Sequence, residues 1–266
     1  MRMPDLALIA LPVAVFTSLA FTLLLRSVRS SRGQGDSTSR LGGLSLICGL
    51  VVTLGIVSAI GQFSGTKMIS PSSSTLTSGY FGPTAVEQTV IWLIMFLPMF
   101  VIGVIEDLKG NLSVRLRFWL AVMVGVVFSG FGADRILNLD LPFLDPLDRY
   151  GLPGQSLGFS LTVVAIAGYT HAMNIVDGLH GLASGSATLM LIGLGSIAMA
   201  VGAVDLAGIA FMIGALSLGF FLVNFPRGLV FLGDCGAYFL GFFVAALAIA
   251  LPARSPTVSP WASRVI

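Results

Sequence analysis

Charged side chains are scarce in this sequence. The 14 lysine and arginine residues and the 12 aspartate and glutamate residues together make up 10% of its 266 positions. Hydrophobic residues make up 56%, and the mean hydropathy is +0.97. This apolar content exceeds what a soluble core needs and matches helices that cross the hydrocarbon of a membrane. The net charge of +2 argues neither for nor against a nucleic-acid partner, and we expect none.

Cysteine and histidine are also rare, with two residues of each. Cys48 lies inside an apolar run, and we place Cys235 in a short polar loop. No C-x-x-C pair and no set of cysteine and histidine residues has the spacing of a metal site. The sequence therefore indicates neither a disulfide framework nor a zinc site.

Long apolar runs, in contrast, are abundant. Eight of them are long enough to span a membrane as helices, near Leu6–Leu25, Leu41–Gly61, Thr89–Ile105, Leu116–Gly132, Leu157–Met173, Leu182–Val201, Leu206–Val223 and Ala237–Leu251. The predicted fold is an all-α integral membrane protein, a polytopic helical bundle that forms one transmembrane domain over residues 1–266. In the segment that follows the fourth run, RILNLDLPFL (residues 135–144) alternates in the manner of a short outer β-hairpin.

The positions of the basic residues predict the orientation of these spans. Arg2 alone precedes the first run, which is long, and the other nearby arginines follow it, so we interpret this run as a span with its N-terminus outside and not as a secretory signal. The inner loops then carry eight of the fourteen basic residues: Arg26, Arg29, Arg32, Arg40, Lys109, Arg115, Arg117 and Arg227. This distribution is a modest positive-inside bias.

Alternate counting of the spans places three polar segments on the same inner face: VIEDLKGNLSVRLR, NIVDGLHG and FPRGLVFLGDCGAYF. We therefore expect Glu106, Asp107, Asn174, Asp177 and Asp234 to converge there. Each of them alone fits a solvated helix cap. Glycines beside the carboxylates, however, let the backbone approach a ligand closely, and carboxylates with an amide suit a hard divalent ion that neutralises a diphosphate.

Four segments together resemble a known enzyme family. SRLGGLS, GVIEDL, NIVDGLHGLASG and FLGDCGAYFLGF, in this order and on one predicted face, are similar to motifs of the polyprenyl-phosphate N-acetylhexosamine-1-phosphate transferases. This family includes the phospho-MurNAc-pentapeptide translocase and the undecaprenyl-phosphate GlcNAc-1-phosphate transferase. The resemblance implies transfer of a sugar-1-phosphate from a UDP-N-acetylhexosamine to a membrane polyprenyl phosphate, with release of UMP and with Mg²⁺ as cofactor. Mn²⁺ is the alternative ion.

The resemblance also implies roles for the acidic residues. Asp234 and Asn174 correspond to Mg²⁺ ligands. Glu106 and Asp107 correspond to the paired aspartates of the family, which act at the polyprenyl-phosphate end as base or positioning groups. Asp177 corresponds to the region that contacts the diphosphate and ribose. Positioning and charge neutralisation are the main demands of phosphoryl transfer, which explains this concentration of acids.

Other residues correspond to the substrate-binding positions of the family. Gly178, Leu179 and Phe231 fall where uracil is held, and His180 replaces an Asp or Asn that faces the base in many members. Arg115 and Arg117 are candidates for binding the lipid phosphate, and ordinary positive-inside arginines are the alternative interpretation.

The sequence departs from the family pattern at several positions. Glu106 replaces the first aspartate of the pair, and no lysine precedes the glycine pair of SRLGGLS, so only Arg32 and Arg40 are available there. His171 lies at the apolar end of the fifth run and is expected to be a structural histidine with satisfied hydrogen bonds.

Family members continue beyond a segment like LPARSPTVSPWASRVI into another span and an inner loop rich in histidine and arginine, whereas this sequence ends at Ile266. We therefore expect a fragment or a weakly active chain.

The interpretation is a multi-pass enzyme of a bacterial inner membrane with its active site facing the cytoplasm, and a homodimer is an open alternative to the monomer. A second hypothesis is a non-catalytic membrane scaffold of the same fold. A transporter is the weakest alternative, because the spans show neither inward-facing ionisable residues nor repeated halves.

Overall fold

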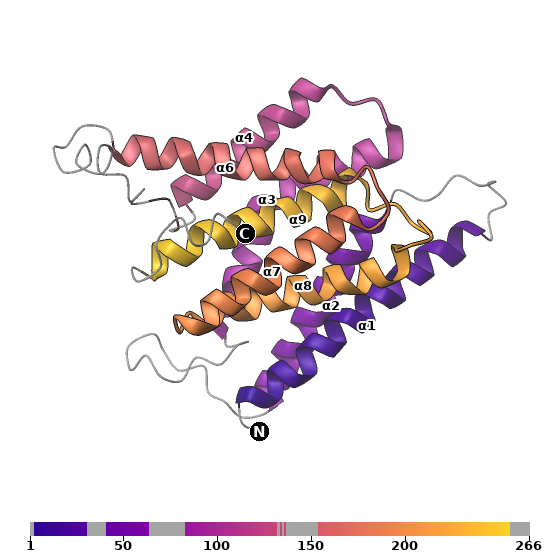
Figure 1. The fold of residues 1–266 in the computed structure, drawn as a ribbon, viewed down its shortest axis with the longest axis horizontal. Coiled ribbons are helices and arrows are strands. Elements are labelled where there is room, and N and C mark those ends of the chain that lie inside the picture. The colour runs from indigo at the N-terminus through magenta and orange to yellow at the C-terminus, as the bar shows by residue number, and fades with distance from the viewer. Residues whose placement is uncertain are drawn as a thin grey trace.

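A computed structural model describes residues 3–30, 41–63, 83–131, 134, 136 and 154–255. This part of the chain folds into eight helices: α1 (Met3–Ser30), α2 (Gly42–Phe63), α3 (Pro83–Lys109), α4 (Val114–Phe131), α6 (Gly154–Val176), α7 (Leu182–Ala200), α8 (Val204–Asn224) and α9 (Gly233–Arg254). Figure 1 shows them as an elongated bundle. The all-α fold and the eight expected spans are confirmed, and the hairpin at residues 135–144 falls almost wholly outside the described residues.

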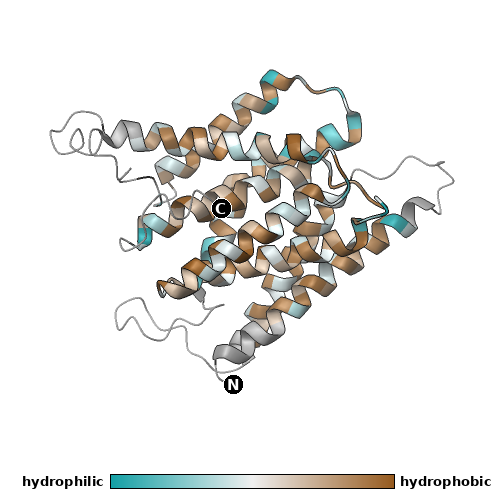
Figure 2. Cartoon of the chain, in the orientation of Figure 1, coloured by the Kyte–Doolittle hydropathy of each residue, from teal (hydrophilic) through white to brown (hydrophobic). Residues whose placement is uncertain are grey.

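All eight helices are long and apolar enough to cross a membrane. The shortest apolar segments have 18 residues, which corresponds to about 27 Å at 1.5 Å per residue, close to the hydrocarbon thickness. Figure 2 colours much of the helical ribbon in the brown of hydrophobic residues, and some of these residues are exposed on the outside of the bundle. Phe16, Trp119 and Leu189, for example, are 70%, 65% and 72% exposed. The chain is a polytopic membrane protein.

Helix α9 forms the centre of the bundle. Its apolar segment is 94% buried, compared with 22% for the segment of α1. It contacts α2, α3, α6, α7 and α8, and Figure 1 shows it lying among them. Aromatic rings fill the space between α9, α3 and α4: Trp92, Phe96, Phe128, Phe239, Phe242 and Phe243. A helix that is apolar on all sides belongs in such a position.

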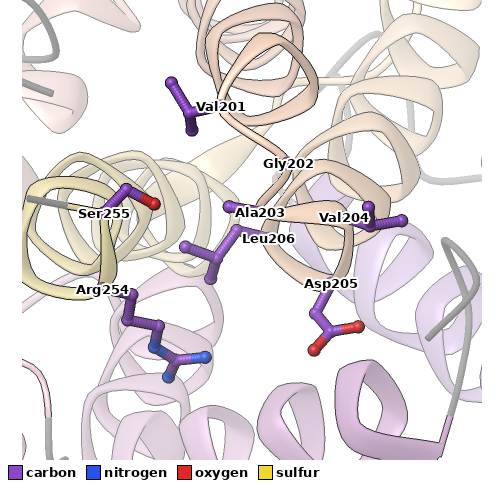
Figure 3. A pocket seen from close by; sticks show the side chains of 8 residues that line it. All are labelled: Val201, Gly202, Ala203, Val204, Asp205, Leu206, Arg254 and Ser255. Atoms are coloured by element: carbon purple, nitrogen blue, oxygen red, sulfur yellow. The ribbon is translucent and has the colours of Figure 1, made fainter. Parts of the chain in front are cut away.

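Polar contacts close the end of the bundle where α9 finishes. Arg254 donates through Nε to Asp134 Oδ1 at 2.7 Å and through Nη2 to Gln88 Oε1 at 2.7 Å. The Asp134 side chain is only 3% exposed, so its carboxylate depends on this guanidinium. Nearby, a cavity of about 240 Å³ lies between the α7–α8 turn and the end of α9, with Asp205 and Arg254 in its lining (Figure 3).

Candidate active site

Three connections meet at the opposite end of the bundle from this cavity. They follow α3, α6 and α8, and they lie together on the right in Figure 1. Each acidic motif of the sequence lies at one of these three connections, either within it or in the adjoining helical turn. The structure thus brings together segments more than a hundred residues apart, as the alternate counting of spans predicts.

Asp107 joins the end of α3 to the start of α9. Its Oδ1 accepts a hydrogen bond from the Asp234 backbone N–H at 2.7 Å, and its Oδ2 accepts one from the Cys235 N–H at 3.0 Å. The first N–H groups of a helix have no partner within the helix, and a carboxylate also complements the positive end of the helix dipole. Asp107 therefore caps α9 and fixes the position of Asp234.

Asp234 lies in the first turn of α9 and binds two side chains through the same oxygen. Its Oδ2 is 2.5 Å from Arg117 Nη1 and 3.1 Å from the Tyr238 hydroxyl, which donates to it. Arg117 also lies 3.6 Å from Glu106 Oε1, so one guanidinium is shared between two carboxylates. Glu106 in turn accepts a hydrogen bond through Oε2 from the Leu112 N–H at 2.7 Å. Arg117 thereby links three helices at the site.

Asp177 follows the last turn of α6 and is partly buried beside the other acids. Burial is the main cause that raises its pKa to about 7, and the nearby carboxylates of Asp107 and Asp234 contribute to this rise, although a hydrogen bond with the Gly233 backbone opposes it. Asn174 lies three residues earlier on α6, so helical spacing brings its side chain to the same face. Negative charge is therefore concentrated between α6 and α9.

The glycine pair of SRLGGLS positions this end of α9. The backbone N–H groups of Gly42 and Gly43 donate to the carbonyls of Phe231 at 3.0 Å and Leu232 at 2.8 Å. A Cβ on Gly43 would lie 2.2 Å from the backbone nitrogen of Gly236, which explains why positions 43 and 236 are both glycine. Gly236 thus permits the close contact between α2 and α9.

Cys235 does not lie in the short polar loop where the sequence analysis places it. It is a buried residue of α9, and a Cβ on Gly103 of α3 would lie 2.7 Å from its Cα. Asp234 before it and the glycines at positions 233 and 236 hid the start of the helix. Close packing of α3 against α9 explains this small pair.

The residues predicted to hold uracil lie at the same end of the bundle as the acidic residues. The rings of His180 and Phe231 lie 5.4 Å apart at 40°. Leu179 is 68% exposed, and no atom lies closer than 3.8 Å to a Cβ placed on Gly178. Gly178 thus leaves open space where a planar ring can approach. Arg115 is exposed, in contrast to Arg117.

Sequence reasoning missed two residues of this region. Asn224, only 2% exposed, connects two loops when its amide nitrogen faces the Val230 carbonyl at 2.7 Å and its oxygen faces the Gly181 N–H at 3.3 Å. Tyr238 was overlooked because it lies within an apolar run. Its position four residues after Asp234, on the same helix face, was the available signal.

The expectation that the hydrogen bonds of His171 are satisfied is wrong for one of its ring nitrogens, and its structural role stays a prediction. Its Nε2 is buried without a hydrogen-bond partner among the described residues. The ring stacks on Phe118, with centroids 6.0 Å apart, and meets Tyr238 edge to face at 5.8 Å. Aromatic packing therefore helps to hold this histidine beside the acidic residues.

The donors at this end suit a hard divalent cation, although no group of three or more His, Cys, Asp or Glu side chains with metal-binding geometry occurs in the described ranges. Mg²⁺ needs only one or two protein carboxylates when substrate phosphates and water complete its shell. Among the described residues, both side-chain hydrogen bonds to Asp234 reach Oδ2, which leaves Oδ1 for such an ion. The pKa of Asp177 is raised first by burial and then by the neighbouring carboxylates of Asp107 and Asp234, and a bound cation would offset the repulsion from these carboxylates.

Comparisons with known proteins agree with this arrangement. The chain is 28% identical over 253 residues to a probable undecaprenyl-phosphate N-acetylglucosaminyl 1-phosphate transferase of Bacillus subtilis, covering 91% of this chain and 62% of the relative. Over 163 residues it is 33% identical to a phospho-N-acetylmuramoyl-pentapeptide-transferase of Streptococcus equi subsp. zooepidemicus, covering 60% of this chain and 46% of the relative. The chain thus spans less than two thirds of the length of these two relatives.

A phospho-N-acetylmuramoyl-pentapeptide-transferase of Streptococcus pyogenes serotype M6 is 47% identical over 254 residues, which cover 92% of this chain and 71% of the relative. Residues 89–252 match the family described as glycosyl transferase family 4. This match includes α4 and α6 to α8, most of α3 and α9, and all the acidic residues of the site. The chain therefore belongs to glycosyl transferase family 4.

Proposed function

We propose that this protein transfers an N-acetylhexosamine-1-phosphate from its UDP derivative to a polyprenyl phosphate. An oxygen of the polyprenyl phosphate forms a bond to the β-phosphorus of the UDP-sugar. The bond from that phosphorus to the bridging oxygen breaks, and UMP leaves with that oxygen. The observation that supports this most is the cluster of Glu106, Asp107, Asp177 and Asp234 at one end of a membrane bundle, in a chain whose relatives are named as such transferases.

Asp234 and Asn174 are the residues that we propose to hold a divalent cation, Mg²⁺ or Mn²⁺. When bound, such an ion supplies positive charge to the diphosphate. Asp107 orients the first turn of α9 through its two backbone hydrogen bonds, so its contribution is to positioning. Glu106 has its Oε2 on the Leu112 N–H and its Oε1 near Arg117, which places it to orient the guanidinium.

Asp177 and Arg117 have distinct proposed tasks. Asp177, with its pKa raised to about 7 by burial, is able to take up or release a proton near neutral pH at the diphosphate. Arg117 lies on α4 and carries a fixed positive charge between Glu106 and Asp234. We propose that it helps to hold the polyprenyl phosphate together with the exposed Arg115.

The nucleotide end of the substrate is proposed to lie against Phe231 and His180. Their neighbouring rings offer stacking surface and a hydrogen-bonding imidazole for uracil. Gly178 and Leu179 border the same space. This end of the bundle is proposed to face the cytoplasm of a bacterium, because UDP-sugars are cytoplasmic and the loops there carry Lys109, Arg115, Arg117 and Arg227.

The direct test measures UMP released from UDP-N-acetylglucosamine, and separately from a UDP-N-acetylmuramoyl-pentapeptide, in detergent with undecaprenyl phosphate and Mg²⁺. Asp234→Asn should lower the rate by at least about 100-fold, because an amide keeps the shape but loses the charge that a hard cation needs. Asp205→Asn is the matched control, since Asp205 lies in the first turn of α8 at the other end. Unchanged release by Asp234→Asn would refute the assignment, and no release from the unmodified chain with either donor would favour the scaffold hypothesis.

A further inference from the structure

Tyr238 is a buried tyrosine whose hydroxyl meets the central acid of the site. The residue is 1% exposed, and its hydroxyl donates to Asp234 Oδ2 at 3.1 Å. A buried tyrosine needs a partner for its hydroxyl, and here that partner is a carboxylate one helical turn away on α9. Hydrogen bonds to charged groups are stronger than those between neutral groups. This contact therefore restrains the carboxylate as well as the tyrosine.

Arg117 alone would hold Asp234 less firmly. A single nitrogen, Nη1, reaches Oδ2 at 2.5 Å, so the contact is not a two-point pair of guanidinium and carboxylate. The same nitrogen lies 3.6 Å from Glu106 Oε1, which competes for it. The last torsion of an aspartate side chain is broad and roughly two-fold, so one contact permits the two oxygens to exchange places. A second donor on the same oxygen hinders that exchange.

The tyrosine ring is itself fixed from a third helix. His171 of α6 meets it edge to face at 5.8 Å and stacks on Phe118 of α4 at 6.0 Å. The contacts of the histidine ring with Phe118 and Tyr238 therefore join α4, α6 and α9 beside the acid. The hydroxyl has a defined position because the ring that carries it is held by aromatic contacts.

We propose that Tyr238 is a positioning residue, whose hydroxyl together with Arg117 holds Oδ2 of Asp234 so that Oδ1 is presented to a divalent cation. This inference rests on the proposed function, because it takes a divalent cation as the ligand of Asp234. It assigns no chemical step to the tyrosine. It explains why a polar aromatic residue occupies the interior of a helix whose apolar segment is 94% buried.

Tyr238→Phe tests the proposal because it removes the hydroxyl and keeps the ring that packs on His171. The affinity for Mn²⁺, measured by electron paramagnetic resonance on the purified chain without lipid or nucleotide, should fall about tenfold, the size expected for one lost hydrogen bond to a charged group. The Mg²⁺ concentration for half-maximal UMP release should rise by a similar factor, while kcat at saturating Mg²⁺ should stay near that of the unmodified chain. Tyr169→Phe is the matched control, since Tyr169 lies partly buried on α6 without a contact to Asp234.

Each outcome has one meaning. Weaker Mn²⁺ binding by Tyr238→Phe, with Tyr169→Phe unchanged, supports the proposal. Equal binding by both variants and the unmodified chain overturns it, and so does a fall in kcat at saturating Mg²⁺ without a change in cation affinity. An absence of Mn²⁺ binding by the unmodified chain also overturns it. If Mn²⁺ binds but no UMP is released, the proposed function fails while the comparison of Mn²⁺ affinities still decides the role of Tyr238.

Discussion

Individual acidic residues at the site differ in what they do, although the sequence presents them as one set. Asp107 uses both of its oxygens on backbone N–H groups of α9. Asp234 is held by side chains, and Asp177 is partly buried near both of them. Residue types and motif order predicted the members of this cluster. They could not predict which groups each acid contacts, because Asp107, for example, accepts a hydrogen bond from a backbone N–H that lies 127 residues away in the sequence.

Asp107→Asn should destabilise the protein, since its amide nitrogen would face a backbone N–H that now donates to the carboxylate. The expected loss in the free energy of unfolding is about 1–3 kcal/mol, the cost of leaving such a group unsatisfied. Thermal unfolding in detergent measures it, with Glu87→Gln as the control because Glu87 is an exposed acid on the same helix. A Tm equal to that of the control would show that the cap is unimportant.

At the level of helices, the sequence predicted the spans but not their polar ends. The long apolar runs located all eight helices, yet Asp107 belongs to the last turn of α3 and Asp234 to the first turn of α9. Hydropathy assigns charged residues to loops, so the predicted spans exclude these two helical turns. The contact of α2 with α9 was also beyond prediction, because glycines give no sign of which backbone they approach.

Gly43→Ala tests this contact between helices. The added methyl group would lie 2.2 Å from the Gly236 nitrogen, so α2 and α9 must move apart, at a cost of about 1–3 kcal/mol. Both the Tm in detergent and UMP release should fall, because the start of α9 carries Asp234. Gly55→Ala on the same helix meets nothing within 4 Å and should leave the Tm equal or slightly higher. Equal behaviour of the two variants would contradict the close packing described here.

The whole molecule has two different polar ends. At one end, Arg254 donates hydrogen bonds to Asp134 and Gln88. These contacts join the start of α3, the segment after α4 and the end of α9. The other end carries the acids of three connections around Arg117. Parity of the spans predicted that these connections share a face, and the fold confirms it. The roles of the residues within the face stay predictions.

Cleavage of the backbone by a bound iron ion tests most directly whether these connections form one cation site. Fe²⁺ in place of Mg²⁺, with ascorbate and peroxide, should cut the purified chain within residues 106–113, 174–181 and 231–236 in the same sample. Excess Mg²⁺ and the Asp234→Asn substitution should each suppress all three cuts together. Cleavage at only one segment, or cuts that persist in Asp234→Asn, would contradict a shared site.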